Sequence, residues 1–221
     1  MRLTIVAATG GIGRQLLRQA VEAGHDVTAM ARSPEKITDP VRTVFADLSR
    51  PDLRELTEAI KGSDAILSGL GARTKFDSGV AGRGTAALVE AAKAADTARL
   101  VVVSAAPLGT FPSPDRPHPP RHDPGDGFFM RHLGAPFAKT MFRAHYDDLA
   151  RMEDVVLASG LDWTISRPPK LTDGPLTGQY RTALDRNIRG GFSVSRADVA
   201  HHMLACLTRP ETIGHTVGIA K

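Results

Sequence analysis

The chain has 221 residues, of which 42% are hydrophobic and 24% charged, so it can bury a substantial core and extensive disorder is not expected. Its one cysteine excludes an internal disulfide, and its N-terminal apolar segment is too short and too rich in glycine for a signal peptide or a membrane span. The net charge of +4 comes from basic residues that are spread along the chain and mixed with acidic ones, which does not favour nucleic-acid binding. We therefore expect a single cytoplasmic domain over residues 1–221, with no nucleic-acid partner and no membrane partner.

In the first half of the chain, strand-like and helix-like segments alternate. Residues 2–7 are short and β-branched, and they lead through a glycine-rich turn into a helix over 13–24 that Gly24 ends. Further segments follow in the same alternation: strands over 25–32, 42–47, 64–71 and 99–106, and helices over 53–62 and 84–95. Apolar strands that alternate with amphipathic helices predict an α/β fold, with a doubly wound, mostly parallel sheet and helices on both faces.

The alternation breaks after Ser104. Residues 107–138 are rich in proline and glycine, too irregular for core and too long for an ordinary connection, so we expect a lid over a substrate site or a flexible insertion. Four apolar side chains in this loop need a surface to pack on: Phe128, Phe129, Met130 and Phe137. A flat hydrophobic acceptor, the protein's own surface and a second subunit all remain open as that surface.

Regular structure then resumes in this order: a helix over 146–160, a strand over 161–168, an extended segment with a turn over 174–185, a helix from 195 and a strand over 215–221. The last helix is predicted to begin at Ser195 as its N-cap, because Asp198 stands at the matching capping-box position. It is predicted to end before Pro210.

The glycine-rich turn after the first strand reads VAATGGIG, from Val6 to Gly13. A strand, a turn of small residues and a helix form the unit in which a dinucleotide pyrophosphate lies at a helix N-terminus, because bare backbone lets the phosphate approach unpaired N–H groups. Gly10 and Gly13 stand where phosphate and helix come close, and Ala7 stands where many such turns begin with glycine. We expect the turn to accept Ala7 if its φ stays negative; the alternative is a tight turn that binds no ligand.

The end of the second strand predicts which dinucleotide binds. NAD-binding proteins place a carboxylate there for the ribose hydroxyls, whereas NADP-binding proteins use basic groups for the 2′-phosphate. This strand ends without a carboxylate, and Arg32, Ser33 and Lys36 supply a guanidinium fork, a hydroxyl and a second cation. We predict NADP(H) as the cofactor, with a solvated basic turn as the alternative.

Several segments together resemble a known family: VAATGGIG, AGHDVTAMARSPEK, FADL, GLGAR, VVVSA, SGLDWTISRPPKLTDGPLTG and ADVAHHMLACL. They are similar to the atypical short-chain dehydrogenase/reductase group with an NAD(P)-binding, NmrA-like fold, and within it to the biliverdin-IXβ reductases, also called NADPH flavin reductases. The resemblance covers nearly the whole chain, and residues 107–138 fit it least. It implies a Rossmann sheet with NADPH lying across the C-terminal ends of the strands.

The resemblance also implies a set of cofactor-binding residues. They are Thr9, Gly10, Gly11 and Ile12 for the pyrophosphate with Gly13 beside them, Arg32 and Lys36 for the 2′-phosphate, Asp47 and Leu48 for the adenine, Leu70, Gly71 and Arg73 for the ribose and phosphate side, and Ser104 and Pro168 for the nicotinamide. Independently of the resemblance, Asp47, Gly71 and Ser104 fall at the ends of predicted strands, where ligands bind in such sheets.

Two residues are candidates for catalytic roles. Ser104 carries a hydroxyl that either orients the nicotinamide or the acceptor, or caps a strand end. Glu153 stands where the biliverdin-IXβ reductases carry a histidine and NmrA-like proteins more often carry glutamate; it is either a helix-face carboxylate bound to backbone or arginine, or a general acid. Many short-chain dehydrogenases use a Tyr-x-x-x-Lys pair, but Tyr146 is followed four residues later by Ala150, so that pair is missing here.

The histidines and the cysteine carry weaker signals. His118 and His122 lie in the proline-rich loop without a second pair of ligands at metal spacing, so no metal site is expected. His202 shares a helix face with Val199 and Cys206, and we predict that His202 and Cys206 pack in the core.

Hydride transfer to a conjugated acceptor places the difficult chemistry on the cofactor, so the protein has only to align two flat groups and exclude water. The sequence therefore predicts an NADPH-dependent reductase of flavins, quinones or similar small molecules, as a monomer or a homodimer. The alternative is an NmrA-like protein without turnover, which binds NADP(H) and passes its redox state to a protein partner.

Overall fold

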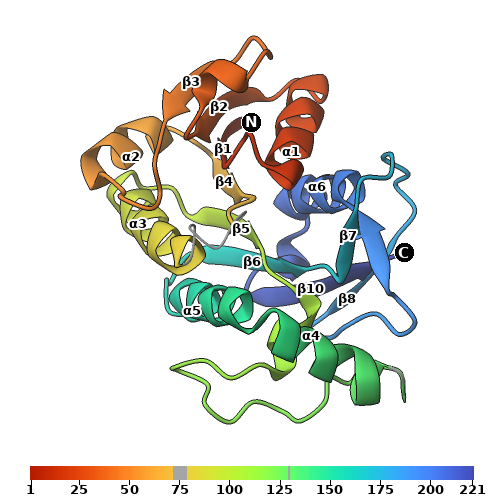
Figure 1. Cartoon of the computed structure of the whole chain (residues 1–221). Coiled ribbons are helices and arrows are strands. Elements are labelled where there is room, and N and C mark those ends of the chain that lie inside the picture. Colours follow the sequence, from red (N-terminus) through yellow and green to blue (C-terminus); the bar gives the residue numbers. More distant parts are fainter. Residues whose placement is uncertain (72–78, 129) are drawn as a thin grey trace.

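The computed structural model describes residues 1–71, 79–128 and 130–221. Its centre, within these ranges, is an eight-stranded sheet in the order β3-β2-β1-β4-β5-β6-β10-β8 (Figure 1). The strands of this sheet are β1 (Arg2–Val6), β2 (Asp26–Ala31), β3 (Arg42–Phe45), β4 (Ala65–Ser68), β5 (Arg99–Val103), β6 (Asp162–Arg167), β8 (Arg181–Leu184) and β10 (His215–Ala220). Two short strands, β7 (Lys170–Thr172) and β9 (Ser193–Ser195), form a second sheet.

The neighbouring strands from β3 to β10 pair in parallel, and the edge strand β8 runs antiparallel to β10. The order 3-2-1-4-5-6 is that of a doubly wound Rossmann sheet, in which the winding reverses beside β1. The predicted α/β fold class is therefore confirmed. The β7–β9 pair could not be predicted, because strands of three residues are too short to show a hydrophobic period.

Helices cover both faces of the sheet (Figure 1). They are α1 (Gly11–Glu22) and α6 (Arg196–Ala205) on one face, and α2 (Leu53–Ile60), α3 (Val80–Ala94) and α5 (Arg143–Leu157) on the other. In β5, Leu100 and Val102 join the core beneath α2, α3 and α5, whereas Val101 and Val103 join the core beneath α1 and α6. Successive side chains of a strand alternate in direction, so a sheet buried on both faces requires this continuously apolar sequence. None of the described helices is both long and apolar enough to cross a bilayer.

Side chains cap most of the helix N-termini that pack on the sheet. Asp52 caps α2, and Ser195 accepts a hydrogen bond from the N–H of Asp198 at 2.9 Å, which confirms Ser195 as the N-cap of α6. At the start of α3, two backbone N–H groups donate to the carboxylate of Asp148 on α5, at 2.8 and 3.0 Å. No side chain caps α5 or α1, and the N-cap residue of α1 is Gly10.

Residues 107–138 contain regular structure near both ends. A 3-10 turn covers Ala106–Thr110, a π-helical turn covers Met130–Gly134, and α4 covers Ala135–Met141. The irregular part is thus shorter than the sequence predicts. Pro136 lies within α4, which follows the π-helical turn without a break.

Hydrogen bonds attach the irregular part of this segment to the rest of the protein. Ser113 Oγ donates to Asp154 Oδ1 on α5 at 2.7 Å. Asp123 Oδ1 accepts a hydrogen bond from the backbone N–H of Asn187 at 2.8 Å. The segment is therefore held to α5 on one side and to the connection between β8 and β9 on the other.

Two of the four apolar side chains that the sequence singles out in this segment are largely exposed. Phe128 is 81% exposed and Phe137 is 64% exposed, whereas Phe129 and the side chain of Met130 lie outside the described part. Of the three surfaces that the sequence leaves open for these residues, the protein's own surface does not cover Phe128 or Phe137.

Candidate functional site

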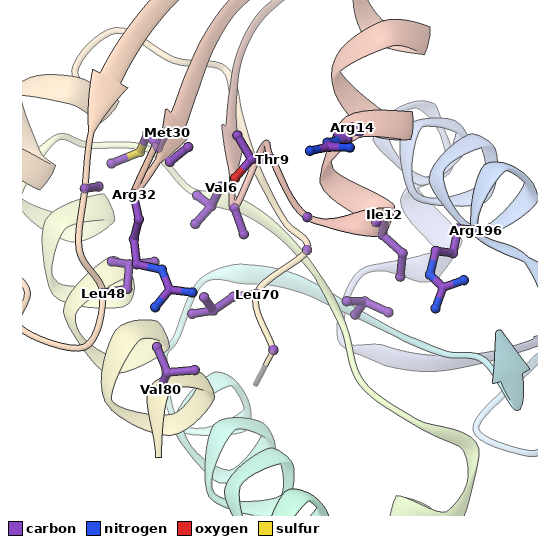
Figure 2. A pocket seen from close by; sticks show the side chains of 18 of the residues that line it. Val6, Thr9, Ile12, Arg14, Met30, Arg32, Leu48, Leu70, Val80 and Arg196 are labelled. Atoms are coloured by element: carbon purple, nitrogen blue, oxygen red, sulfur yellow. The ribbon is translucent and has the colours of Figure 1, made fainter. Parts of the chain in front are cut away.

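A cleft of about 780 Å³ lies at the C-terminal ends of β1, β2, β4 and β5 (Figure 2). The winding of the sheet reverses between β1 and β4, and ligands of such sheets bind at this point, outside the carboxyl ends of the strands. The cleft is walled by the turn after β1, by the starts of α3 and α6, and by one side of α5. Its position is therefore that of a dinucleotide site.

The turn between β1 and α1 is closed by its own backbone. The N–H of Gly10 donates to the carbonyl of Ala7 at 2.8 Å, and Ala7 adopts a φ of 58°, in the left-handed region. The condition of a negative φ is therefore not met: the turn forms nevertheless, and the alanine takes on strain of about 1 kcal/mol. A Cβ on Gly13 would collide with the carbonyl oxygen of Ala7, so the glycine lets α1 pack directly against the turn.

Besides Ala7, the lining includes the four residues predicted for the pyrophosphate: Thr9, Gly10, Gly11 and Ile12. Gly13 is not part of the lining and lies behind them. Because α1 has neither a capping side chain nor an acidic residue in its first turn, its first backbone N–H groups stay available to a ligand. Bare backbone at an open helix N-terminus suits a phosphate, so the residues present fit the pyrophosphate of a dinucleotide.

Basic residues gather in the cleft at the end of β2. Arg32, Ser33 and Lys36 all belong to the lining. Figure 2 shows Arg32 reaching into the cleft from the end of β2, on the opposite side of the turn from Arg14 and Arg196. No described lining residue at this end is acidic, so the wall offers positive charge and a hydroxyl to whatever binds there.

The residues predicted for the adenine and ribose side lie in two hollows. Three of them line the main cleft: Leu48, Leu70 and Gly71. Asp47 lies in a smaller pocket of about 50 Å³ between β3 and α2. Hydrogen bonds from the side chain and the backbone N–H of Ser49 lower the pKa of Asp47, so this carboxylate is an acceptor at neutral pH. Arg73 lies outside the described residues.

At the end of β5, Ser104 lines the cleft and is hydrogen-bonded to a buried ion pair. Its Oγ donates to Glu153 Oε1 at 2.6 Å, and Glu153 is fully buried on α5. Arg167, the last residue of β6, donates to both carboxylate oxygens, from Nε at 2.9 Å and from Nη2 at 2.6 Å. Glu153 is thus a carboxylate bound to an arginine, one of the two roles that its sequence position leaves open.

Arg116 and Pro168 lie next to this ion pair but do not line the cleft. Arg116 Nη2 donates to the carbonyl of Leu108 at 2.8 Å and lies 3.8 Å from Glu153 Oε2. Pro168 is buried, and its carbonyl accepts a hydrogen bond from the N–H of Ala106 at 2.9 Å. Pro168 therefore supports the backbone just beyond Ser104, and the lining itself does not include it.

Four polar residues of the lining were not singled out from the sequence: Arg14, His145, Asp173 and Arg196. Arg196 Nη1 lies 2.6 Å from Asp173 Oδ1, and the Arg196 side chain packs on Gly11, where a Cβ would come within 2.8 Å of Nε. Arg14 stands directly after Gly13 in the first turn of the helix, which is a usable sequence signal. Arg196 and Asp173 have no such signal, because only the tertiary fold brings them to the turn.

His145 lies half-buried on the face of α5 that borders the cleft, one helical turn before Leu149. Burial lowers the pKa of its imidazole, and the carboxylate of Asp148 opposes this only in part. A neutral imidazole can donate one hydrogen bond and accept another. His145 therefore adds a polar group to an otherwise apolar stretch of the wall.

The remaining histidines do not contribute to the cleft. His202 is 1% exposed and lies 3.6 Å from Cys206 Sγ, and burial lowers the pKa of His202 to about 4. The prediction that His202 and Cys206 pack in the core is confirmed. His118 and His122 are exposed, and the part of the chain that the structure describes holds no group of three or more potential metal ligands.

Known proteins resemble this chain both in sequence and in structure. The chain is 30% identical over 221 residues to the uncharacterised sugar epimerase YhfK from Bacillus subtilis (strain 168), which covers 96% of this chain and 90% of that protein. The structure of the present chain is similar to that of a short-chain dehydrogenase/reductase from Veillonella parvula DSM 2008 in complex with NADP. The TM-score is 0.77 at 17% identity, and the match covers 100% of this chain and 94% of that one. It is also similar to a candidate NADH-flavin reductase from Streptococcus pneumoniae TIGR4, with a TM-score of 0.76, 23% identity, and coverage of 100% and 99%. At these identities the two structures establish the fold alone.

The family follows from a match along most of the chain. A family model described as NAD(P)H-binding matches residues 7–210. This range includes the turn before α1, the basic end of β2, and Ser104 at the end of β5. The chain belongs to this NAD(P)H-binding family.

Proposed function

We propose that this protein is an NADPH-dependent oxidoreductase that transfers a hydride to a flavin, a quinone or a similar conjugated small molecule. The observation that carries the proposal is the course of the cleft, which runs from the cations at the end of β2, across the open N-terminus of α1, to Ser104 at the end of β5. In the order β2-β1-β4-β5 these ends are three strand intervals apart, about 14 Å. A dinucleotide lies across the strand ends of such a sheet in this direction.

The end of β2 supports NADPH over NADH. The guanidinium of Arg32 can form two parallel hydrogen bonds with a phosphate, and Lys36 adds a second positive charge. An unphosphorylated ribose needs an acceptor for its hydroxyls, and the described lining residues at this end include no carboxylate.

The end of β5 supports hydride transfer to a flat acceptor. Bound NADPH supplies the hydride, so the chain has to hold two rings against each other and exclude water. Val103, Leu149 and Leu171 give this end apolar walls, and Ser104 and His145 are polar groups that can orient the rings.

Proton transfer does not require a tyrosine here. Tyr146 is buried, and burial raises the pKa of its hydroxyl, so it is a poor acid at neutral pH. A flavin or a quinone that has received a hydride can take its proton from solvent. The resemblance to the biliverdin-IXβ reductases adds a bilin to the acceptors worth testing. The Streptococcus neighbour is named as an NADH-flavin reductase, so a flavin is the first acceptor to test.

The proposal is tested by measuring whether the purified protein oxidises NADPH. The absorbance of the reduced nicotinamide is monitored with FMN, a bilin or one of several quinones as the acceptor. We expect turnover with at least one acceptor, and a lower KM for NADPH than for NADH. If none of these acceptors raises the oxidation rate above background, the protein is not the proposed reductase.

Arg32→Ala tests the assignment of the 2′-phosphate. We expect the Kd for NADPH to rise by about 10-fold, because a charge-assisted hydrogen bond is lost, and the Kd for NADH to stay the same. Arg54→Ala is the matched control, because it removes the same charge from an exposed position on α2 outside the cleft lining. An equal effect of Arg32→Ala on both nucleotides contradicts the assignment.

A second function is favoured by the exposed apolar side chains before α5. Five of them are more than half exposed: Phe128, Leu133, Phe137, Met141 and Phe142. A sensor that binds NADP(H) and passes its redox state to a protein partner needs an apolar surface of this kind. The same assay separates the two functions, because tight NADPH binding without oxidation by any acceptor favours the sensor.

A further inference from the structure

Resting on the proposed cofactor, we propose that Ser104 meets the nicotinamide only as a hydrogen-bond acceptor, and that it thereby selects the amino group of the carboxamide over a carbonyl oxygen. The buried pair of Glu153 and Arg167 enforces this direction. Glu153 is a positioning residue, because it acts through Ser104 and is buried away from the cleft.

Both protons of Ser104 are already used within the protein. Its hydroxyl donates to Glu153 Oε1 at 2.6 Å, and its backbone N–H donates to the carbonyl of Ser166 at 2.8 Å. A hydroxyl oxygen carries two lone pairs besides its proton, so the side of the oxygen that faces the cleft can only accept. A ligand at the end of β5 must therefore bring a donor to Ser104.

The two arginines beside Glu153 determine which partner donates in the hydrogen bond between Ser104 and Glu153. Arg167 donates to each of the two oxygens of Glu153, and Arg116 Nη2 brings a second positive charge to 3.8 Å from Oε2. A carboxylate held by a bidentate guanidinium accepts hydrogen bonds and has none to give. Ser104 is therefore the donor in this bond.

The nicotinamide carboxamide offers Ser104 both kinds of group, an amino group with two N–H donors and a carbonyl oxygen. Facing the amino group, Ser104 gains a hydrogen bond. If it faces the carbonyl oxygen instead, two acceptors meet and neither receives a hydrogen bond. Such an unpaired acceptor weakens binding in a desolvated site. The carboxamide is thus held one way round, and Ser104 cannot serve as an oxyanion donor toward a carbonyl substrate.

The inference is tested by measuring the Kd of NADP+ and the Kd of its 3-acetylpyridine analogue by calorimetry. The analogue keeps the ring and the carbonyl oxygen but carries a methyl in place of the amino group. We expect the unchanged protein to bind NADP+ about 3- to 10-fold more tightly, the ratio that one hydrogen bond supplies. Ser104→Ala is expected to abolish this preference, and Ser104→Thr, which keeps the hydroxyl, to retain it.

A matched control is Ser113, whose hydrogen-bond acceptor Asp154 follows Glu153 on α5. Ser113 Oγ donates to Asp154 Oδ1 at 2.7 Å, and Ser113 is 7% exposed, as is Ser104, but it is not part of the cleft lining. Ser113→Ala removes an equivalent buried bond to a carboxylate, so it reproduces any general loss of stability. We expect the preference for NADP+ to stay unchanged in this variant.

The role of the ion pair is tested with Ser104 left in place. Glu153→Leu combined with Arg167→Met replaces the pair by apolar side chains, an exchange that buried ion pairs often tolerate. The hydroxyl proton of Ser104 is then free to turn to the cleft and donate to a carbonyl oxygen. We expect the preference for NADP+ over the analogue to fall as it does in Ser104→Ala; an unchanged preference refutes the role of Glu153.

The outcomes separate the inference from the proposed function. If both nucleotides bind the unchanged protein equally, or Ser104→Ala keeps the full preference, the inference is overturned while the cofactor assignment stands. If neither nucleotide binds, the proposed cofactor fails and the inference fails with it. If Ser104→Ala does not fold, Ser104→Cys, whose sulfur is a weaker acceptor, carries the comparison.

Discussion

The carbonyl oxygen of Ala7 occupies the space that a Cβ on Gly13 would need. Helix α1 therefore rests directly on the backbone of the turn, and its N-terminus reaches the cleft without an intervening side chain. Gly13 serves the cofactor site by packing, since it is not itself part of the lining.

Gly13→Ala is expected to lower the free energy of unfolding by about 3 kcal/mol, because the colliding atom is backbone and cannot rotate away. Urea unfolding measures this change. Gly127→Ala is the control: a Cβ there meets nothing within 4 Å, and its free energy of unfolding is expected to stay within about 0.5 kcal/mol. A Gly13→Ala protein as stable as the unchanged one contradicts the direct contact.

Ala7→Gly is expected to raise the free energy of unfolding, by up to about 1 kcal/mol, because the residue has a φ of 58°. The greater freedom of glycine in the unfolded chain keeps the gain small. The same change in the middle of α3, Ala87→Gly, is expected to lower it by about 1 kcal/mol. Opposite signs in urea unfolding support the strain at Ala7, whereas a loss at both positions speaks against it.

Glu153→Gln is expected to lower the free energy of unfolding by about 3 kcal/mol, because it leaves the buried guanidinium of Arg167 without its anion. Thermal and urea unfolding measure the loss. The control is Glu22→Gln, at an exposed pair in which Glu22 Oε1 lies 3.9 Å from Arg18 Nε, and its effect is expected to stay below about 0.5 kcal/mol. Similar effects at the two sites would show that the buried pair does not act as a unit.

Burial of His202 predicts a loss of stability in acid. Burial, together with the charges of Arg209 and His201, lowers the pKa of His202 from 6.5 to about 4. Between these values the unfolded chain binds a proton that the folded chain does not, so this residue lowers the free energy of unfolding as the pH falls, by about 2 kcal/mol at pH 5.

Urea unfolding at pH 7 and pH 5 checks this prediction. In His202→Gln the difference between the two pH values is expected to shrink by that amount. In His201→Gln, a change at the exposed neighbour, it is expected to persist. An unaltered pH dependence in His202→Gln means that another group titrates in this range.

Much of the fold could be predicted because it is specified locally. The apolar run of β5 indicates burial on both faces, and Ser195 with Asp198 marks the start of α6 within four residues. The turn before α1 and the basic end of β2 are likewise contained in short stretches of sequence. The doubly wound, mostly parallel sheet follows from the alternation of strands and helices and from the handedness of their connections.

The parts that could not be predicted depend on contacts between distant segments. Arg196 reaches Gly11 only because α6 packs beside α1. The φ of Ala7 is set by the closure of the turn, which overrides the preference of alanine. For Glu153 the sequence leaves open a bond to backbone or arginine and a role as general acid, and the bond to Arg167 follows from the position of β6 beside β5.

The hydrogen bonds from the start of α3 to Asp148 on α5 join two walls of the cleft. Val80 at the start of α3 lies on the side of the cleft near Arg32 and Leu70, as Figure 2 shows, whereas Leu149 on α5 lines the part in which we propose that the acceptor binds. Because one carboxylate on α5 accepts both hydrogen bonds, a shift of either helix is coupled to the other wall of the cleft. In the proposed binding mode, a bound nucleotide would set the spacing of both walls before an acceptor arrives, so we expect ordered binding with the nucleotide first.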